Sequence, residues 1–376
     1  MHADDTLALG TLARDGVLME LARPLFEILD QYPGATELVV NGPGRASIEV
    51  DAGWRSVAQP SLTLDWASSF AKSVATFTQQ RISEQHPILS ATLPKGERLQ
   101  VMLPPSVEQG TVSLTLRIPG SKIKPLDEYE SEGYFGRYVW AVNADKLQER
   151  SRELTTVDRG LCDLLSAHRL GDFLRECVRQ RKNIAVVGDT GSGKTTLMKS
   201  LCQHIPHDER LITIEDVREL RLPKHDNRVH MLYSKGGQGT SVLKPADLIA
   251  SCMRSKPDRV LLAELRGSEA FDFLKLLTTG HNGSITSYHA ESCALAFDRY
   301  VFMVKEHEDA AIFDADQVKR LVTLTLDVIV HVVADVVEID GQRQKRRYVR
   351  QVHFDPVAKL DTQIGRAHLV GPGAGE

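Results

Sequence analysis

Little in this 376-residue chain suggests disulfides or a strong electrostatic field. It has five cysteines, and no two of them form a Cys-x-x-Cys pair. That spacing argues against a disulfide framework and against a zinc ribbon. Aromatic residues make up only 6% of the chain, and the formal net charge is −4. Because there is no global basic field, we expect no sequence-specific nucleic-acid binding.

Long apolar runs are also missing. The longest, Val328 to Val337, is interrupted by His331 and Asp335 and is much shorter than the ~20 residues that cross a bilayer. The first residues, Met1-His-Ala-Asp-Asp, contain no apolar signal core. Since reduced thiols are typical of the cytoplasm, we predict a cytoplasmic protein that associates with a membrane only peripherally.

Hydrophobic periodicity predicts two domains of α/β type. Residues 1–120 contain two helical patterns and several short strand patterns joined by turns, which is typical of a small α+β domain. Residues 121–158 alternate in charge, and we interpret them as a linker that is partly helical near 144–154. In residues 159–355, strand and helix patterns alternate, which predicts a mostly parallel sheet covered by helices.

The end of the chain shows two further patterns. Residues 328–354 predict a terminal hairpin with a turn at Asp340-Gly341. The basic run 343–347 flanks that turn, and we interpret it as a solvated face of the hairpin. Residues 356–376 are expected to form a flexible tail, because they end in Gly-Pro-Gly-Ala-Gly-Glu.

The clearest motif lies at residues 184–196. An apolar strand pattern leads into Gly188-Asp-Thr-Gly-Ser-Gly-Lys-Thr195, which matches the phosphate loop GxxxxGK[ST] between a strand and a helix. Glycines let this backbone approach a phosphate closely, and the amides and the helix N-terminus face the anion. The residues predicted to bind ATP here are Gly188, Asp189, Thr190, Gly191, Ser192, Gly193, Lys194, Thr195 and Thr196. Lys194 would bridge the β- and γ-phosphates, and the Thr195 hydroxyl would bind Mg²⁺.

Hydrolysis also needs carboxylates that handle water and metal, and two strand patterns end in them. Residues 211–216 end in Glu215 and Asp216, at the edge of an α/β sheet where ligands bind. Helix capping explains Asp216 equally well. Residues 259–264 have the Walker B form and end in Glu264, but Ala263 stands where many such motifs place an Asp. Metal binding would therefore depend on Thr195, Glu264 and water.

Two histidines lie near another strand pattern. His281 and His289 flank a segment that contains Gly283 and the strand pattern 285–288. A single histidine is usually structural, but two beside a glycine turn at the same sheet edge favour phosphate sensing.

Four motifs in this order resemble those of the secretion ATPases: the phosphate loop, Ile214-Glu-Asp216, Ala263-Glu-Leu-Arg-Gly267 and the two-histidine segment. The most similar branch is the hexameric ATPase of type IV secretion. The segments that carry this closer resemblance are 233–239, 252–267 and 279–286, together with 37–44, 93–105 and 110–117 in the N-terminal half.

The resemblance implies a homo-hexameric ring with the N-terminal domains in one tier and RecA-like domains in the other. It implies Mg²⁺-dependent ATP hydrolysis between the two domains of a protomer, which powers substrate translocation or pilus assembly. The implied partners are other cytoplasmic and inner-membrane ATPases and components of a secretion machine, with peripheral association at the inner membrane.

The resemblance also assigns roles to particular residues. Arg98 and Arg117 match N-terminal-domain arginines that reach the phosphates. Catalytic roles go to Lys194, Glu215, Glu264 and His289. Glu215 would orient the attacking water and Glu264 the metal-bound water, and the sequence leaves open which of them is the effective base.

Three alternatives remain. A type II secretion or pilus-assembly ATPase is the nearest. Many extension motors of that group carry a four-cysteine zinc insert, which this chain lacks, but the Tad-type pilus ATPases lack it too. A transporter nucleotide-binding subunit is suggested by Gly236-Gly-Gln238, but no Leu-Ser precedes that segment. A scaffold ring that nucleotide merely stabilises is disfavoured, because the phosphate-loop lysine and both glutamates are present.

Overall fold

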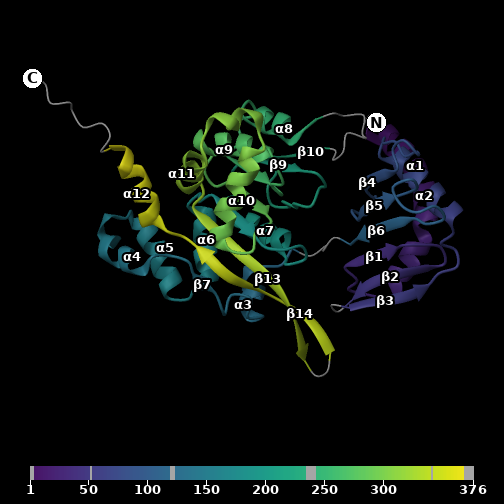
Figure 1. The fold of residues 1–376 in the computed structure, drawn as a ribbon, viewed down its shortest axis with the longest axis horizontal. Helices are drawn as coiled ribbons and strands as arrows, with labels where there is room; N and C mark the ends of the chain where they lie inside the picture. Colours follow the sequence, from purple (N-terminus) through teal and green to yellow (C-terminus); the bar gives the residue numbers. More distant parts are fainter. Residues whose placement is uncertain (1–3, 51–52, 119–122, 234–242, 340–341, 368–376) are drawn as a thin grey trace, which may run out of the picture.

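The chain forms two sheets with separate helices, and the computed structural model describes residues 4–50, 53–118, 123–233, 243–339 and 342–367. The smaller domain, purple and blue in Figure 1, is built on a six-stranded antiparallel sheet in the order β3-β2-β1-β6-β5-β4. Its elements are α1 (Asp4–Gln31), β1 (Glu37–Val40), β2 (Arg45–Val50), β3 (Gly53–Ala58), α2 (Leu64–Phe77), β4 (Ile88–Thr92), β5 (Arg98–Met102) and β6 (Ser113–Arg117). The predicted strands and helices of this domain are confirmed, and the exposed edge strand β3 is an addition to them.

Strand alternation gives the small sheet two different faces. In β5, Leu99 and Val101 are buried with α1 and α2, whose Leu25 and Phe70 are fully enclosed. The residues between them point the other way, because side chains on a strand alternate with period 2. Arg98 therefore lies on the face that borders a cavity shared with the large domain.

The large domain is built on an eight-stranded sheet in the order β10-β9-β11-β12-β8-β13-β14-β7. Neighbouring strands run parallel, except that β14 is antiparallel to β13. The strands are β7 (Val139–Trp140), β8 (Ile184–Val187), β9 (Leu211–Glu215), β10 (Arg228–Leu232), β11 (Arg259–Leu262), β12 (Ile285–Tyr288), β13 (Val328–Ile339) and β14 (Gln342–His353). The mostly parallel α/β architecture predicted for this part of the chain is confirmed.

Helices cover both faces of this sheet. They are α3 (Leu126–Ser131), α4 (Ala144–Arg150), α5 (Thr156–Ser166), α6 (Leu170–Arg179), α7 (Lys194–Cys202), α8 (Pro245–Cys252), α9 (Glu269–Thr278), α10 (Cys293–Lys305), α11 (Ala315–Thr325) and α12 (Pro356–Ala367), with 3₁₀ turns at Ser151–Glu153 and Glu308–Ile312. No helix in the described part of the chain is both long and apolar enough to span a membrane.

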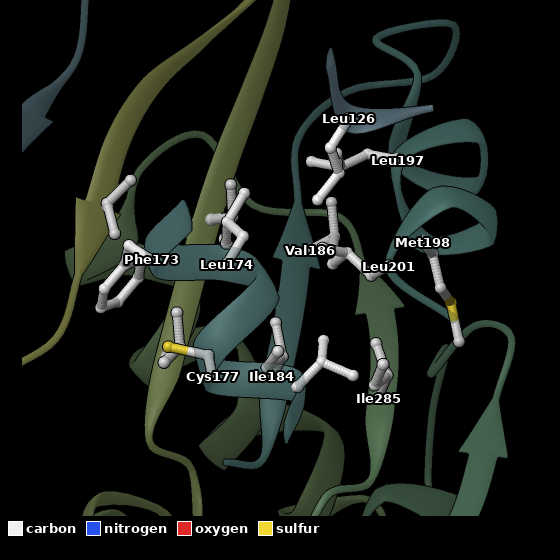
Figure 2. Packing of buried hydrophobic residues seen from close by; sticks show 14 of the residues in the cluster. Leu126, Phe173, Leu174, Cys177, Ile184, Val186, Leu197, Met198, Leu201 and Ile285 are labelled. Carbon is white, nitrogen blue, oxygen red and sulfur yellow. The ribbon is translucent and has the colours of Figure 1, made fainter. Parts of the chain in front are cut away.

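The central strand β8 shows why the sheet is buried on both sides. Ile184 and Val186 pack with α6 and α7 (Figure 2), whereas Ala185 and Val187 belong to the core on the opposite face. All four residues are at most 1% exposed. A continuous apolar strand of this kind is typical of a parallel sheet between two helical layers.

The segment that we interpreted as a linker packs against the large domain in the part that the structure describes. It contains α3, β7 and α4, and β7 pairs with β14 at the edge of the large sheet. The Trp140 indole Nε1 donates to the Phe354 carbonyl at 2.9 Å, and Tyr134 is buried in the core. Aromatic burial therefore attaches this segment to the large domain, and the boundaries at 120 and 158 stay predictions.

The C-terminal region also differs from expectation in three places. Strand β14 begins at Gln342 rather than near 348, so the basic run lies on a strand. Helix α11 was not predicted. Residues 356–367, which we expected to be part of a flexible tail, form α12. The predicted turn at 340–341, the rest of the predicted tail at 368–376 and the segment Gly236–Gln238 lie outside the described residues.

Candidate functional site

The phosphate loop leaves β8 and enters α7 with three glycines in the left-handed region. Gly188, Gly191 and Gly193 have φ values of 148°, 76° and 98°. At Gly188 a Cβ atom would lie 2.1 Å from the carbonyl oxygen of Val332 on β13. A side chain is therefore excluded there, and the neighbouring strand fixes the start of the loop.

A cavity of about 440 Å³ opens beside this loop, which is within the ~300–1,000 Å³ of ordinary ligand pockets. Residues from both domains line it: Arg98, Arg117, Asp189, Thr190, Gly191, Gly193, Lys194, Thr195, Thr196, Glu264, Leu265, Arg266, His289 and Arg299. Of the predicted site residues, Gly188, Ser192 and Glu215 are not among those that line it. Ser192 is buried and its hydroxyl donates to the Asp189 carbonyl at 2.8 Å, so it shapes the loop from within.

The small domain contributes two arginines that face each other across a strand pair. Arg98 on β5 and Arg117 on β6 are direct partners in the antiparallel register. Like charges in such a position destabilise a sheet. Both side chains border the cavity that also contains the phosphate loop, so an anion bound there would lie near two cations of the small domain.

Lys194 is nearly buried at the start of α7, with 7% of its surface exposed. Its ammonium donates to the carbonyls of Gly188 and Asp189 at 2.8 and 2.9 Å. Burial lowers the pKa of Lys194 to about 8, although the nearby Glu264 carboxylate favours the charged form. A desolvated cation in this position is poised to interact strongly with a phosphate, because the local dielectric is low.

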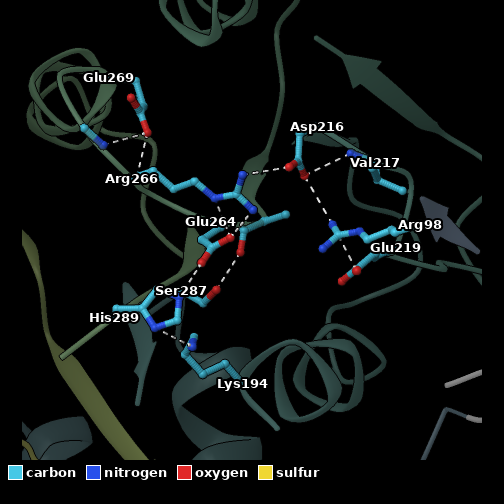
Figure 3. Close-up of polar contacts among 12 residues, drawn as sticks. Arg98, Lys194, Asp216, Val217, Glu219, Glu264, Arg266, Glu269, Ser287 and His289 are labelled. Atoms are coloured by element: carbon cyan, nitrogen blue, oxygen red, sulfur yellow. Dashed lines mark hydrogen bonds and ion pairs between the residues drawn. The ribbon is translucent and has the colours of Figure 1, made fainter. Parts of the chain in front are cut away.

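From Lys194 a chain of polar contacts runs across the site (Figure 3). His289 Nδ1 lies 3.3 Å from the Lys194 ammonium, and its Nε2 lies 3.1 Å from a Glu264 oxygen. Burial and the charge of Lys194 lower the pKa of His289. The other Glu264 oxygen accepts a 2.6 Å hydrogen bond from Arg266 Nε. Both oxygens of Glu264 are therefore oriented by neighbours at the cavity wall.

The chain continues through Asp216 into the small domain. Arg266 Nη1 donates to one Asp216 oxygen at 2.8 Å, and Arg98 Nη2 donates to the other at 3.2 Å. The same Arg98 nitrogen lies 3.0 Å from Glu219. Asp216 thus binds one arginine from each domain, a role that the sequence did not single out.

Glu215 occupies a different environment from the one expected. Its side chain is fully buried and accepts from the Thr213 hydroxyl and from the amides of Glu219 and Leu220, each at 2.8 Å. These bonds fix the loop after β9, and none of them leads to the cavity. The structure therefore gives Glu215 a loop-positioning environment and turns the adjacent Asp216 toward the arginines.

The oxygen ligands at the cavity suit a hard divalent cation. Thr195 and Glu264 both border it, and hydroxyl and carboxylate oxygens are typical magnesium ligands. Among the described residues no cluster of three or more His, Cys, Asp or Glu side chains could hold a metal. Mg²⁺ commonly takes one or two protein ligands together with substrate phosphates, so the test of fit here is the pair Thr195 and Glu264. Ala263, at the position of the missing Asp, uses its carbonyl to accept from Ser287 at 2.6 Å.

Comparison with known proteins places the chain among secretion ATPases. The family model described as "Type II/IV secretion system protein" matches residues 150–360. The type IV secretion system protein VirB11 of Brucella suis is 41% identical over 338 residues, covering 89% of this chain and 90% of that protein. PtlH of Bordetella pertussis is 39% identical, covering 83% and 88%.

Solved structures agree with these relatives. The crystal structure of the Brucella suis VirB11 ATPase in complex with sulphate matches with a TM-score of 0.52 and 40% identity, covering 94% of this chain and 99% of that one. The pilus retraction motor PilT shares the fold, with a TM-score of 0.53 and 16% identity. These matches confirm the resemblance drawn from the motifs, and the chain belongs to the type II/IV secretion system protein family.

Proposed function

We propose that this chain is the ATPase subunit of a type IV secretion machine, which hydrolyses ATP with Mg²⁺ in the cavity between its two domains. One observation carries the proposal: the cavity joins Arg98 and Arg117 of the small domain to Lys194, Thr195, Glu264 and His289 of the large domain. Cations from two domains around one phosphate loop can bind a triphosphate and respond to its loss.

Lys194 is the principal electrostatic catalyst in this proposal. On binding ATP its ammonium exchanges the loop carbonyls of Gly188 and Asp189 for phosphate oxygens. Negative charge that develops on the transferred phosphoryl group is then stabilised by a preorganised cation, and removing one such donor commonly costs about 10²–10³-fold in rate.

Glu264 is the better candidate for handling the attacking water, because it borders the cavity and Glu215 does not. Arg266 and His289 hold its two oxygens in place. A glutamate in this position can accept a proton from water. Thr195 and Glu264 would hold Mg²⁺, which neutralises phosphate charge when it is bound.

Arg98 would act as the link between the domains. It is bound by Asp216 and Glu219, and a γ-phosphate would compete with these carboxylates for the same guanidinium. ATP and ADP then differ in their contacts with the small domain, which is what a conformational effector requires. Arginine suits this role because its planar fork binds phosphate oxygens and stays charged.

The family relationship supports the remaining parts of the proposal. VirB11 of Brucella suis and PtlH of Bordetella pertussis are named as type IV secretion system proteins. By analogy with this branch we propose a homo-hexameric ring, cytoplasmic and peripheral to the inner membrane, that works with other ATPases and components of the machine.

Phosphate release by the purified protein tests the proposal. We expect Mg²⁺-dependent turnover that Lys194→Ala abolishes and that Lys319→Ala leaves unchanged, since Lys319 pairs with Asp298 on the surface and does not line the cavity. Sedimentation with a non-hydrolysable ATP analogue should show a ring. Near-normal turnover by Lys194→Ala would overturn the assignment of the phosphate loop, and a monomer at micromolar concentration would contradict the ring.

A further inference from the structure

The β13–β14 hairpin lies against the phosphate loop and reaches the small domain. Its strands pair from Ile329–His353 to Ile339–Gln342, and its distal part projects beyond the body of the large domain, below it in Figure 1. The carbonyl of Val332 on β13 lies so close to Gly188 that a side chain would not fit there. The hairpin therefore packs against the start of the phosphate loop.

Two residues of the basic run are engaged, contrary to the expected solvated face. Arg347 Nε donates to the carbonyl of Gly191 at 2.9 Å. The Cδ atom of Arg347 would lie 3.4 Å from a Cβ placed on Gly193. Arg347 therefore holds the phosphate loop through one hydrogen bond at Gly191, and it leaves little room for a side chain at Gly193.

The neighbouring Lys345 joins the hairpin to the other domain. Its ammonium lies 3.2 Å from a carboxylate oxygen of Glu49 on β2, with 29% and 21% of the two side chains exposed. The second Glu49 oxygen accepts from the Thr36 hydroxyl at 2.8 Å. Burial alone would raise the pKa of Glu49, but the bonds from Thr36 and Lys345 and the charges of Lys345 and Arg347 lower it overall. Glu49 is thus a fixed anion facing the hairpin.

Neither Lys345 nor Arg347 is among the residues that line the nucleotide cavity. They approach the phosphate loop from outside, so they can position it without occupying the place of a phosphate. We propose that Glu49, Lys345 and Arg347 form an interdomain latch, in which docking of the small domain on the hairpin holds the phosphate loop in its nucleotide-binding shape.

The latch has a thermodynamic consequence. If nucleotide binds only when the domains are docked, the apparent affinity equals the intrinsic affinity multiplied by the fraction of molecules that are docked. Breaking Glu49–Lys345 should therefore weaken nucleotide binding without removing any group that contacts the nucleotide. This inference rests on the proposed nucleotide site and adds a second connection between the domains, apart from the one through Arg98.

The test measures ADP affinity for Glu49→Gln, Lys345→Gln and the double variant. A partly exposed ion pair is worth little, so we expect each single change to weaken binding by about two- to fivefold. The double variant should be no weaker than either single one, because both remove the same contact. Reversing the pair with Glu49→Lys and Lys345→Glu together should restore part of the affinity, while thermal unfolding reports any general loss of stability.

Arg350→Gln provides the matched control. It removes one charge from the same strand, but Arg350 pairs with Asp335 and Tyr348 on the hairpin itself, and ADP affinity should not change. Tighter binding by Glu49→Gln would overturn the latch and assign Lys345 to direct phosphate contact, and unchanged affinity in both single variants would also overturn it. If Lys194→Ala fails to weaken ADP binding, the nucleotide site itself is wrong, which is a separate outcome.

Discussion

Asp216→Asn probes the contact that joins one arginine of each domain. The substitution keeps the size of the side chain and removes its charge. Asp216 is bound by Arg98 at 3.2 Å and by Arg266 at 2.8 Å, with side-chain exposures of 14%, 23% and 27%. Two different effects should follow, one on nucleotide affinity through Arg98 and one on catalysis through Arg266.

The size of the effect on ATP affinity can be estimated from the Arg98–Asp216 ion pair. A γ-phosphate must take Arg98 away from Asp216, so ATP binding includes the loss of that contact. Because the pair is partly exposed, its net value is about 1 kcal/mol, at the upper end for surface pairs. Removing the competitor should therefore tighten ATP binding by about fivefold, since 1.4 kcal/mol corresponds to tenfold. ADP binding should change little.

The effect on turnover should have the opposite sign. Arg266 uses Asp216 and Glu264 as its two anchors, and without the first it holds the Glu264 carboxylate less firmly. We expect slower phosphate release despite tighter ATP binding. Calorimetry with a non-hydrolysable ATP analogue and with ADP, together with a phosphate-release assay, measures both effects.

Glu219→Gln is the matched control, because Glu219 pairs with Arg98 and not with Arg266. It should also tighten ATP binding but leave the rate of phosphate release close to that of the parent. Weaker ATP binding in Asp216→Asn would refute the reasoning, because it would mean that Asp216 assists Arg98 and does not compete with phosphate.

Three further predictions concern the large domain. Glu264→Gln should keep nucleotide binding but lose about 10²–10⁴-fold in turnover, the usual contribution of a general base; a parental rate would exclude Glu264 from catalysis. Glu215→Gln should lower the free energy of unfolding by about 1–3 kcal/mol in urea titrations, because one of two buried acceptor oxygens becomes an amide nitrogen that cannot accept and the charge is removed; unchanged stability would contradict the loop-positioning role. ATP affinity should fall as the pH rises above 8, because the free protein must regain the proton that Lys194 loses above its pKa of about 8, whereas bound phosphate raises that pKa; Lys194→Ala should not show this fall.

The strands around the site could be predicted because their signals are local. Residues 184–187 are apolar and β-branched in part, and the glycine-rich loop after them marks the exact end of the strand. The acidic residue or histidine after each neighbouring strand then falls on the carboxyl edge of the sheet, where ligands of open α/β folds bind. Lys194, Glu264 and His289 were found in this way, and all three border the cavity.

The choice between Glu215 and Asp216 could not be made from composition alone. Side chains two apart on a strand share a face, so Glu215 follows the buried Thr213 into the interior. Asp216 is the first residue after β9 and turns to the arginines. The alternation was present in the sequence, but both faces of β9 are buried, so which of the two carboxylates turns to the arginines depends on the tertiary structure.

Other elements depend on distant partners or on a signal that was overlooked. The two-residue strand β7 forms because it pairs with the edge of β14, and no sequence pattern within Val139–Trp140 indicates that pairing. Helix α11 had a local signal, since Asp314 and Gln317 form a capping box. The contact of Lys345 with Glu49 joins residues far apart in the chain, and a basic run gives no information on such a partner.

The most direct test of the account is the ratio of ATP to ADP affinity in Arg117→Ala. Arg117 belongs to the small domain, is the direct partner of Arg98 on the adjacent strand and borders the cavity beside the phosphate loop. If ATP binds between the domains and the small domain senses its γ-phosphate, the substitution should weaken ATP binding several-fold more than ADP binding. Equal weakening of both nucleotides, or no weakening of either, would contradict the claim that the two domains share one ATP site.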